Sequence, residues 1–382
     1  MRPRKEAPPA PGRPPRTGPE VIEAGFSTPV PVVAVGADQS ATYALMRDAE
    51  VIAGGQSGGL GDPEAERAWR IELNGLLGRN SVTRAVVAAD LHPGYRSRAL
   101  AEDLASGRGW PVFLVQHHFA HFCAVLLEHG MRPGEEALGL ILDGTGYGTD
   151  GTVWGCEILE GSLLGFHRKG HLRKVPMPGG SAAVMEPRRM AAAHLAAAGL
   201  GHDWPELDPV IRSGSLSPMT SSAGRLFDAA AYILGVSPAR VTSQAEAAAL
   251  LESAADPSEK GRFEMEVDGN CVIDPSGALR GLLDGRITVA ARAAMFHNGL
   301  ARALTDAAVR VLGGRRLPVV LAGGCWVNAV LLCAVKEMLS EEGLDVLHGR
   351  DLPPGDGAVA AGQAASVAAN MIAGTSDGRG GA

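Results

Sequence analysis

Residues 138–159, LGLILDGTGYGTDGTVWGCEIL, decide how the whole chain is interpreted. An apolar segment, Leu138–Leu142, ends at Asp143, and a glycine-bearing turn follows before apolar residues resume. This pattern predicts strands joined by a turn that lets the backbone approach a ligand closely. Residues 32–52, VVAVGADQSATYALMRDAEVI, show the same order of strand, polar turn and further strands. This internal repeat predicts two related lobes. Two unrelated hairpins are the alternative.

The rest of the chain alternates between helical and strand-like spacing. Apolar periodicity predicts helices over 64–77, 96–105 and 118–129 and strands over 85–89 and 112–115. Beyond Pro178 the pattern becomes mainly helical, with one more strand at Val319–Ala322 that runs into Gly323-Gly324 and a helix. A strand, a glycine pair and a helix in this order turn backbone N–H groups toward an anion.

Composition sets the expected domain boundaries. Residues 1–29 are rich in proline and arginine and lack the apolar core of a secretory signal, so we expect a disordered tail. We expect an N-terminal lobe over 30–175 and a C-terminal lobe over 176–373. Residues 374–382 are expected to form a second disordered tail.

Charge and cysteine content exclude several classes of protein. The 382 residues carry a formal net charge of −7 with scattered basic residues, which argues against a nucleic-acid partner. The sequence contains no apolar run near the roughly 20 residues of a membrane helix. The five cysteines stand singly, without a CxxC pair, so we expect a reducing, cytoplasmic location rather than a disulfide framework or a zinc knuckle.

A histidine-rich run, VQHHFAH at residues 115–121, is a candidate metal site. His117 and His121 are four residues apart, so on one helix their imidazoles point the same way and can reach one ion. Neutral imidazole is a common metal ligand, and a histidine-rich surface turn is the alternative. His118 lies on another helix face, where we expect it to contact substrate or solvent.

Two aspartates in glycine-flanked loops can complete a set of four ligands. Asp143 follows the apolar strand, and Asp356 lies in the run PPGDG at residues 353–357. Together with two histidines they provide the raw material of an open metal site. Helix capping is the alternative for both, and it is strongest for Asp356 because a helix follows directly.

Two glycine-bearing segments are candidates for binding phosphate groups. The hairpin that starts at Gly144 can cradle phosphates with its backbone amides, although many tight turns share this pattern. The second segment is Gly323-Gly324, with Asn328 one helical turn later.

Seven segments in sequence order closely resemble the C-terminal domain of HypF, the carbamoyltransferase of [NiFe]-hydrogenase maturation. They are VQHHFAH, LILDGTGYGTDGTVWG, VPMPGGSAAVMEPRRMA, TSSAGRLFDAAAYILG, FHNGLA, LAGGCWVNAVLL and PPGDGAVAAGQA. The run DLHPGY at residues 90–95 also matches. The same domain is similar to the catalytic subunit of tRNA threonylcarbamoyl transfer and to antibiotic O-carbamoyltransferases. The resemblance covers roughly residues 32–370.

The resemblance implies a fold and a set of site residues. The fold is α/β and two-lobed, of the actin, sugar-kinase and Hsp70 (ASKHA) class, with mixed sheets flanked by helices and a cleft for a nucleotide and a metal. The metal-binding and catalytic set falls on His117, His121, Asp143 and Asp356, and the divalent metal is iron or zinc. Nucleotide contacts fall on Gly144, Thr145, Gly146, Gly179, Gly180, Gly323, Gly324 and Asn328.

The resemblance also implies an activity. HypF takes carbamoyl-adenylate and passes its carbamoyl group to the C-terminal cysteine of HypE, so we expect a carbamoyltransferase that binds ATP, AMP or carbamoyl-adenylate. Full-length HypF carries a YrdC-like domain that makes the adenylate, and from these residues we expect no such domain in this chain. We therefore expect a YrdC-like protein to supply the adenylate in trans and a HypE-like protein to accept the carbamoyl group.

Two departures from the family pattern keep other functions open. Ser181 stands where the family's PGGD loop has an acid, and TSQAEA at residues 242–247, which contains Gln244, replaces YEGQAA. Both changes put nucleotide binding in the pocket in doubt. One alternative, favoured by the missing HypF modules, is a small-molecule O-carbamoyltransferase. The other is a non-catalytic regulator that binds a nucleotide or a metal, because a fold alone does not fix function.

Overall fold

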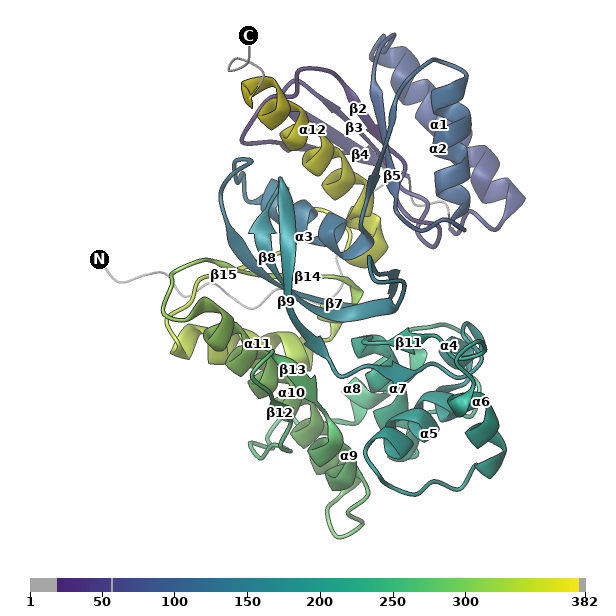
Figure 1. The fold of residues 1–382 in the computed structure, drawn as a ribbon, viewed down its shortest axis with the longest axis vertical. Coiled ribbons are helices and arrows are strands. Elements are labelled where there is room, and N and C mark those ends of the chain that lie inside the picture. The colour runs from purple at the N-terminus through teal and green to yellow at the C-terminus, as the bar shows by residue number, and fades with distance from the viewer. Residues whose placement is uncertain (1–18, 56–57, 378–382) are drawn as a thin grey trace.

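The computed structural model describes residues 19–55 and 58–377 (Figure 1). The parts of the expected tails at 1–18 and 378–382 lie outside the described residues. The expected tails are too long, because Glu20–Glu23 form strand β1 and residues 374–377 belong to the last helix. Ile22 is only 8% exposed, so this short strand contributes to the core despite its proline-rich neighbourhood.

The first sheet has six strands in the order β1-β4-β3-β2-β5-β6. The pairs from β1 to β2 are antiparallel, and β2, β5 and β6 run parallel. The strands are β1 Glu20–Glu23, β2 Val32–Ala34, β3 Tyr43–Arg47, β4 Glu50–Gly54, β5 Val86–Asp90 and β6 Val112–Val115.

The second sheet has nine strands, with the path β12-β13-β9-β8-β7-β14-β15 and with β10 and β11 beside it. The strands are β7 Ala137–Tyr147, β8 Val153–Ser162, β9 Gly165–Leu172, β10 Val175–Pro176, β11 Met219–Thr220, β12 Glu266–Val267, β13 Val272–Asp274, β14 Val319–Ala322 and β15 Val346–His348. The expected division between residues 175 and 176 falls inside β10, so the sheets do not follow that boundary.

The two sheets repeat one topology. Strands β4-β3-β2-β5-β6 and β9-β8-β7-β14-β15 share the same order of three antiparallel strands followed by two parallel ones. This order confirms the predicted repeat and excludes two unrelated hairpins.

Helices cover both faces of both sheets (Figure 1). Helices α1 (Pro63–Arg79) and α2 (Arg96–Ser106) lie on one face of the first sheet, and α12 (Val359–Asp377) lies on the other. Helix α3 (His117–Glu128) covers one face of the second sheet, and α7 (Ala223–Ile233) and α10 (Val289–Leu312) cover the opposite face. Among the described residues, no helix combines the length and the apolarity needed to span a membrane.

The remaining helices lie beyond residue 181. They are α4 Ala182–Met185, α5 Pro187–Ala197, α6 Asp208–Arg212, α8 Glu246–Ala254, α9 Ser276–Leu282 and α11 Ala329–Glu341, with the 3-10 turns η1 Pro205–Leu207, η2 Gly324–Val327 and η3 Gly355–Ala358. Pro187 opens α5 and separates it from α4, because proline fits the first turn of a helix but not its interior.

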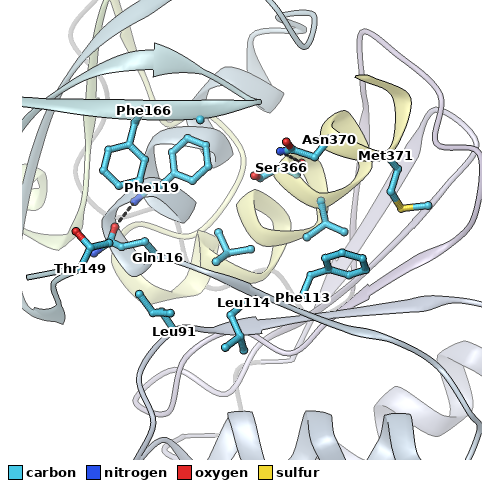
Figure 2. Close-up of a pocket in the computed structure, with 13 residues that line it drawn as sticks. Leu91, Phe113, Leu114, Gln116, Phe119, Thr149, Phe166, Ser366, Asn370 and Met371 are labelled. Atoms are coloured by element: carbon cyan, nitrogen blue, oxygen red, sulfur yellow. Dashed lines mark hydrogen bonds between the residues drawn. The ribbon is translucent and has the colours of Figure 1, made fainter. Parts of the chain in front are cut away.

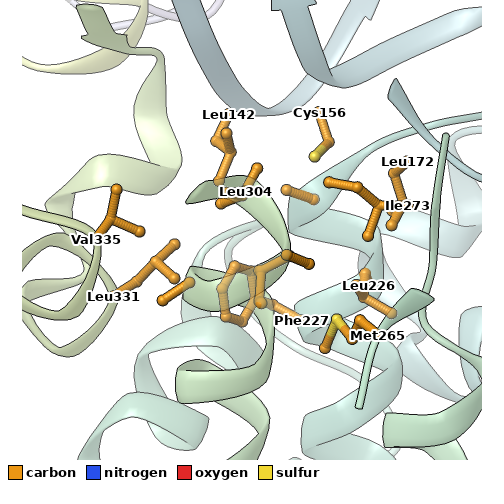
Figure 3. Close-up of a cluster of buried hydrophobic side chains, with 14 of the residues drawn as sticks. Leu142, Cys156, Leu172, Leu226, Phe227, Met265, Ile273, Leu304, Leu331 and Val335 are labelled. Atoms are coloured by element: carbon orange, nitrogen blue, oxygen red, sulfur yellow. The ribbon is translucent and has the colours of Figure 1, made fainter. Parts of the chain in front are cut away.

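Strand β7 is buried on both faces and connects two parts of the core. Leu140 and Leu142 pack with Phe227 of α7 and with α10 and α11 in one hydrophobic cluster (Figure 3). Ile141 points the other way and packs with α3 and α12. A strand covered on both faces has a nearly continuous apolar sequence, which explains the run LGLIL.

Helices α3 and α12 approach each other at Gly362. A Cβ atom added to Gly362 would lie 1.8 Å from the carbonyl oxygen of Ala120, so no side chain fits there. This close approach fixes the C-terminal helix against the helix that carries the histidine-rich run.

The burial of His194 on α5 should make the stability of the fold depend on pH. The ring is 1% exposed, and neither of its nitrogen atoms has a hydrogen-bond partner among the described residues. Burial, with a smaller contribution from Arg173, lowers the pKa of His194 to about 3. Because the unfolded chain binds a proton near pH 6.5 and the folded chain does not, stability falls as the pH drops below about 6.5.

We expect His194→Leu to remove this acid sensitivity. Between pH 7.5 and pH 5 the wild-type protein should lose about 2 kcal/mol of unfolding free energy through this residue, and the variant should not. Urea unfolding at the two pH values measures the difference. Equal pH dependence in the two proteins would contradict the assigned protonation state.

Candidate metal centre

Helix α3 presents two histidines toward one point. The helix begins directly after the edge strand β6, and the Gln116 side chain caps it by accepting a hydrogen bond from the Phe119 amide at 2.8 Å. His117 and His121 follow one helical turn apart, both almost fully buried, and their Nε2 atoms are 3.2 Å apart. The helix starts one residue earlier than predicted, and the shared face is the one that the spacing indicates.

Two aspartates from distant parts of the chain meet this pair. Asp143 lies where the register of β7 against β8 shifts, and its Oδ2 atom is 3.2 Å from His117 Nε2 and 3.3 Å from His121 Nε2. Asp356 lies in η3 just before α12, and its Oδ1 atom is 3.4 and 3.6 Å from the same two nitrogen atoms. The structure thus brings together all four residues that the sequence singles out.

The four side chains fit one metal ion. Each offers one ligand atom, and the four atoms lie within 4.8 Å of one another. Donors about 2.1 Å from a tetrahedral ion stand about 3.4 Å apart, which agrees with the 3.2 to 3.6 Å separations between the histidine nitrogens and the carboxylate oxygens. Two imidazoles and two carboxylates suit zinc or divalent iron.

Asp90 is a buried partner of this cluster that the sequence analysis does not assign. Its Oδ2 atom is 2.8 Å from His117 Nδ1, and both side chains are almost completely buried. A proton on Nδ1 donated to Asp90 leaves the Nε2 lone pair free for a metal. In the sequence, the feature that could have indicated this role is the position of Asp90 at the end of a buried strand.

We expect Asp90→Asn to weaken metal binding roughly 10- to 100-fold while the fold is retained, because an amide is a poorer acceptor for the His117 Nδ1 proton. Competition with a chromophoric chelator measures the affinity. Asp48→Asn, at an exposed turn of the same sheet, is the matched control and should bind metal like the wild type. Unchanged affinity in Asp90→Asn would remove Asp90 from the site.

The charges of the four residues are strongly coupled. Burial lowers the pKa of His117, but Asp356, Asp143 and Asp90 outweigh it and raise that pKa well above its ordinary value. Burial raises the pKa of Asp143, but the two histidines hold it well below its usual range. The same balance lowers the pKa of Asp356 to about 2. Protons and a metal therefore compete for the same histidine nitrogens, so metal affinity should fall as the pH falls.

Glycines allow the backbone to close around Asp143. The Gly324 amide donates to Asp143 Oδ1 at 3.2 Å, and a Cβ atom at Gly324 would lie 3.0 Å from the same oxygen. Gly323 has φ +101°, and a Cβ atom there would lie 2.3 Å from the Leu142 carbonyl oxygen. Gly144 follows Asp143, and the Ser222 hydroxyl donates to its carbonyl oxygen at 2.5 Å. Gly144, Gly323 and Gly324 thus border the cluster.

The other candidate nucleotide residues have distinct surroundings. Thr145 is partly exposed beside Gly146, and a Cβ atom at Gly146 would lie 2.4 Å from the His118 ring, so Gly146 has a packing role. The Asn328 side chain caps α11 and contacts His297 Nε2 at 3.0 Å. This is the capping role typical of asparagine at a helix start.

Gly179 and Gly180 form a tight turn between β10 and α4. Both have positive φ values, and their backbone amides donate to the carbonyl oxygens of Leu216 and Met177.

His118 is fully buried, and its Nδ1 atom lies 3.2 Å from the side-chain amide nitrogen of Gln116. The expectation that His118 contacts solvent is therefore wrong. A helix packed between the second sheet and α12 leaves no exposed face at this position.

Known structures share this fold. A crystal structure of full-length HypF in its phosphate- and nucleotide-bound form matches with a TM-score of 0.83 and 29% identity, covering 92% of this chain and 57% of that one. The crystal structure of T. kodakarensis HypF matches with a TM-score of 0.82 and 27% identity, covering 93% and 49%. Fold and site therefore define a two-lobed α/β protein of the ASKHA class, as predicted.

Family models and relatives place the chain more narrowly. The model described as "HypF Kae1-like domain" matches residues 27–128, and "Carbamoyltransferase, Kae1-like Domain, second subdomain" matches residues 139–363. The chain belongs to the HypF carbamoyltransferase family. It is 39% identical to the "Carbamoyltransferase HypF homolog" of Cupriavidus necator, over 90% of this chain and 93% of that protein.

Longer relatives extend beyond the matched region. The chain is 37% identical to "Carbamoyltransferase HypF" of Rhizobium leguminosarum bv. viciae over 91% of its own length but only 46% of that protein. It therefore spans about half the length of this and several other HypF proteins that it matches.

Proposed function

We propose that this chain transfers a carbamoyl group from carbamoyl-adenylate to a cysteine thiolate at the C-terminus of a HypE-like protein. The observation that carries the proposal is the convergence of His117, His121, Asp143 and Asp356 on one buried point. Membership of the HypF carbamoyltransferase family supports the same chemistry.

The four side chains would hold a divalent iron or zinc ion. Held there, the ion would supply Lewis acidity at the carbamoyl carbonyl oxygen, where negative charge develops during transfer. Asp90 keeps the His117 proton on Nδ1, which fixes the ring orientation and frees Nε2. The buried position of both histidines excludes bulk water, which limits hydrolysis of a reactive donor.

Transfer is a displacement at the carbamoyl carbon. A bond forms between the acceptor sulfur and this carbon, and the bond from the carbon to the phosphate oxygen breaks. AMP leaves with the electron pair of the broken bond. In the proposal, the backbone amide of Gly144, together with Thr145, holds the adenylate phosphate, while the Gly324 amide keeps its hydrogen bond to Asp143. The HypF structure with phosphate and nucleotide bound supports a nucleotide in this fold.

The chain itself supplies no nucleophile in this proposal. Cys325, near the cluster, has a pKa raised well above its ordinary value by burial, so its thiol stays protonated. In the proposal a YrdC-like protein makes the carbamoyl-adenylate in trans. A free thiolate acceptor needs a reducing compartment, so the proposal locates the reaction in the cytoplasm.

The test is reconstitution with three components. We expect the metal-loaded chain, a YrdC-like protein and a HypE-like acceptor, given carbamoyl phosphate and ATP, to produce AMP and an acceptor that carries one carbamoyl group on its C-terminal cysteine. Mass spectrometry of the acceptor measures the product. The matched control is an acceptor with that cysteine changed to serine.

The outcomes separate the proposal from its alternatives. Release of AMP without any carbamoylated protein, but with a carbamoylated hydroxyl compound, would indicate a small-molecule O-carbamoyltransferase. Tight binding of AMP without turnover of the adenylate would indicate a regulator. Either result contradicts the proposed acceptor.

A further inference from the structure

Helix α3 carries a third polar side chain on the face that holds the two histidines. His117, His121 and Glu128 stand at positions i, i+4 and i+11 of the helix. This spacing keeps them on one face, because three helical turns take about 11 residues. The residues from His117 to Leu127 are buried, whereas Glu128 is partly exposed. One helix face therefore carries two proposed metal ligands and, farther along, a carboxylate outside the cluster.

The Glu128 carboxylate binds a loop from a distant part of the chain. Its Oε1 atom accepts hydrogen bonds from the backbone amides of Asp351 and Leu352 at 2.7 and 2.6 Å, and its Oε2 atom accepts one from the Arg350 amide at 3.1 Å. Successive backbone N–H groups that converge on one anion form a recurrent anion-binding arrangement. The partners are 222 to 224 residues apart in the sequence, so these bonds join two separate elements.

The position of Glu128 on α3 supports a role beyond the helix itself. Glu128 is the last residue of α3, and the C-terminal end of a helix carries partial negative charge, which disfavours a glutamate. At the other end the helix already has a cap, because the Gln116 side chain accepts a hydrogen bond from the Phe119 amide at 2.8 Å (Figure 2). The bound loop, and not the stability of α3, accounts for Glu128.

The bound loop leads directly to a proposed metal ligand. Only the residues PPG, 353–355, separate Leu352 from Asp356. Leu352 is buried in the hydrophobic cluster that includes parts of α3 and α12, so its side chain holds the loop as well. The two prolines have fixed φ angles, and a Cβ atom at Gly355 would lie 3.3 Å from the Cα atom of Gly324. The position of Leu352 therefore determines where Asp356 lies.

Asp356 depends on its loop more than the other three ligands do. His117 and His121 lie on the long helix α3, and Asp143 lies on β7 and accepts a hydrogen bond from the Gly324 amide. Asp356 lies in the four-residue turn η3, and its side chain is 18% exposed, compared with 10% for Asp143 and 1% for each histidine. A short turn holds a side chain less precisely than a helix or a strand.

We infer that Glu128 is a positioning residue for the metal centre, because it holds residues 350–352 so that Asp356 reaches the ion bound by His117 and His121. The inference rests on the metal site of the proposed function, and it goes further by assigning a residue that touches neither the metal nor the substrate. Glu128 connects the helix that carries two ligands to the loop that carries another. It thereby sets the distance between them.

The first test is zinc affinity, measured by competition with a chromophoric chelator. We expect Glu128→Ala to bind zinc about 10-fold more weakly than the wild type, at the lower end of the range for residues that orient metal ligands. The midpoint of urea unfolding should stay close to that of the wild type, because water can reach the three amides at this partly exposed site. Glu128→Gln keeps one acceptor oxygen and should bind zinc within about 3-fold of the wild type.

A double-mutant cycle shows whether Glu128 acts through Asp356. Asp356→Ala keeps three of the four ligands, and adding Glu128→Ala to it should lower zinc affinity by less than about 2-fold, because the residue that Glu128 positions is gone. A further loss of about 10-fold in that background would mean that Glu128 acts on the fold as a whole, which overturns the assignment.

The visible absorption of the cobalt-loaded proteins gives a second readout, because its bands depend on the number and geometry of the ligands. We expect the spectrum of Glu128→Ala to shift from that of the wild type toward that of Asp356→Ala. A spectrum identical to that of the wild type contradicts the positioning role.

Glu135→Ala is the matched control. Glu135 accepts a hydrogen bond from the Arg132 backbone amide at 2.9 Å in the loop after α3, so this variant loses the same kind of contact and should bind zinc like the wild type. Wild-type affinity in Glu128→Ala, or an equal loss in Glu135→Ala, overturns the role of Glu128 whatever the transfer activity. A chain that shows the Glu128 effect on zinc but transfers no carbamoyl group contradicts the proposed function and leaves the role of Glu128 intact.

Discussion

His117→Ala should release the metal and lower carbamoyl transfer at least about 1000-fold, or about 4 kcal/mol of transition-state stabilisation. His117 contacts three carboxylates through its two nitrogen atoms, whereas His121 contacts two. Its removal therefore eliminates a metal ligand and leaves Asp90 buried without its partner, and a buried unpaired charge is costly. Elemental analysis and the reconstituted transfer assay measure the two effects.

The matched control is His129→Ala at the C-terminal end of the same helix. His129 contacts the His348 carbonyl oxygen and no residue of the cluster, so this variant should keep its metal. A circular dichroism spectrum like that of the wild type would show that His117→Ala remains folded. An equimolar metal content in folded His117→Ala would refute the proposed ligand set.

The second large effect is expected for Gly362→Ala. A Cβ atom 1.8 Å from the Ala120 carbonyl oxygen forces α12 away from α3. We expect a loss of about 2–3 kcal/mol of unfolding free energy, although alanine favours a helix over glycine by about 1 kcal/mol. Because Asp356 directly precedes α12 and the two histidines lie on α3, the metal affinity should fall as well.

Gly374→Ala provides the comparison on the same helix. A Cβ atom there meets no atom within 4 Å, so the substitution should be neutral or slightly stabilising. Urea unfolding and chelator competition measure both variants. Gly362→Ala with wild-type stability and metal affinity would show that the contact between α3 and α12 does not position the site.

The sequence predicts the parts of the site that depend on local spacing. The histidine pair needs only the geometry of one helix, and β6 has its predicted bounds, Val112–Val115. The meeting of Asp143 with Asp356 follows from the family resemblance and not from spacing. The role of Asp90 depends on how β5 lies beside α3, and a local sequence pattern does not predict this packing.

Strand β9 shows why some elements escape detection. Its sequence, GFHRKGHL, is too polar for a core strand. In the structure, Arg168 stacks on Trp154 at 4.1 Å from the ring centroid and pairs with the buried Glu157. Paired charges and a covered arginine stem allow a polar strand to lie inside a sheet. Both partners come from the neighbouring strand β8, so the sequence of β9 alone does not reveal them.

The position of α12 has a consequence for how the protein is made on the ribosome. The strands of the first sheet precede the second sheet in the chain, but helix α12, which covers one of their apolar faces, follows it. Lobes usually fold as their residues emerge, yet this one must wait until α12 has been synthesised. Until then, Val32, Ala34 and Met46 in the nascent chain lack the helix that covers them in the folded protein.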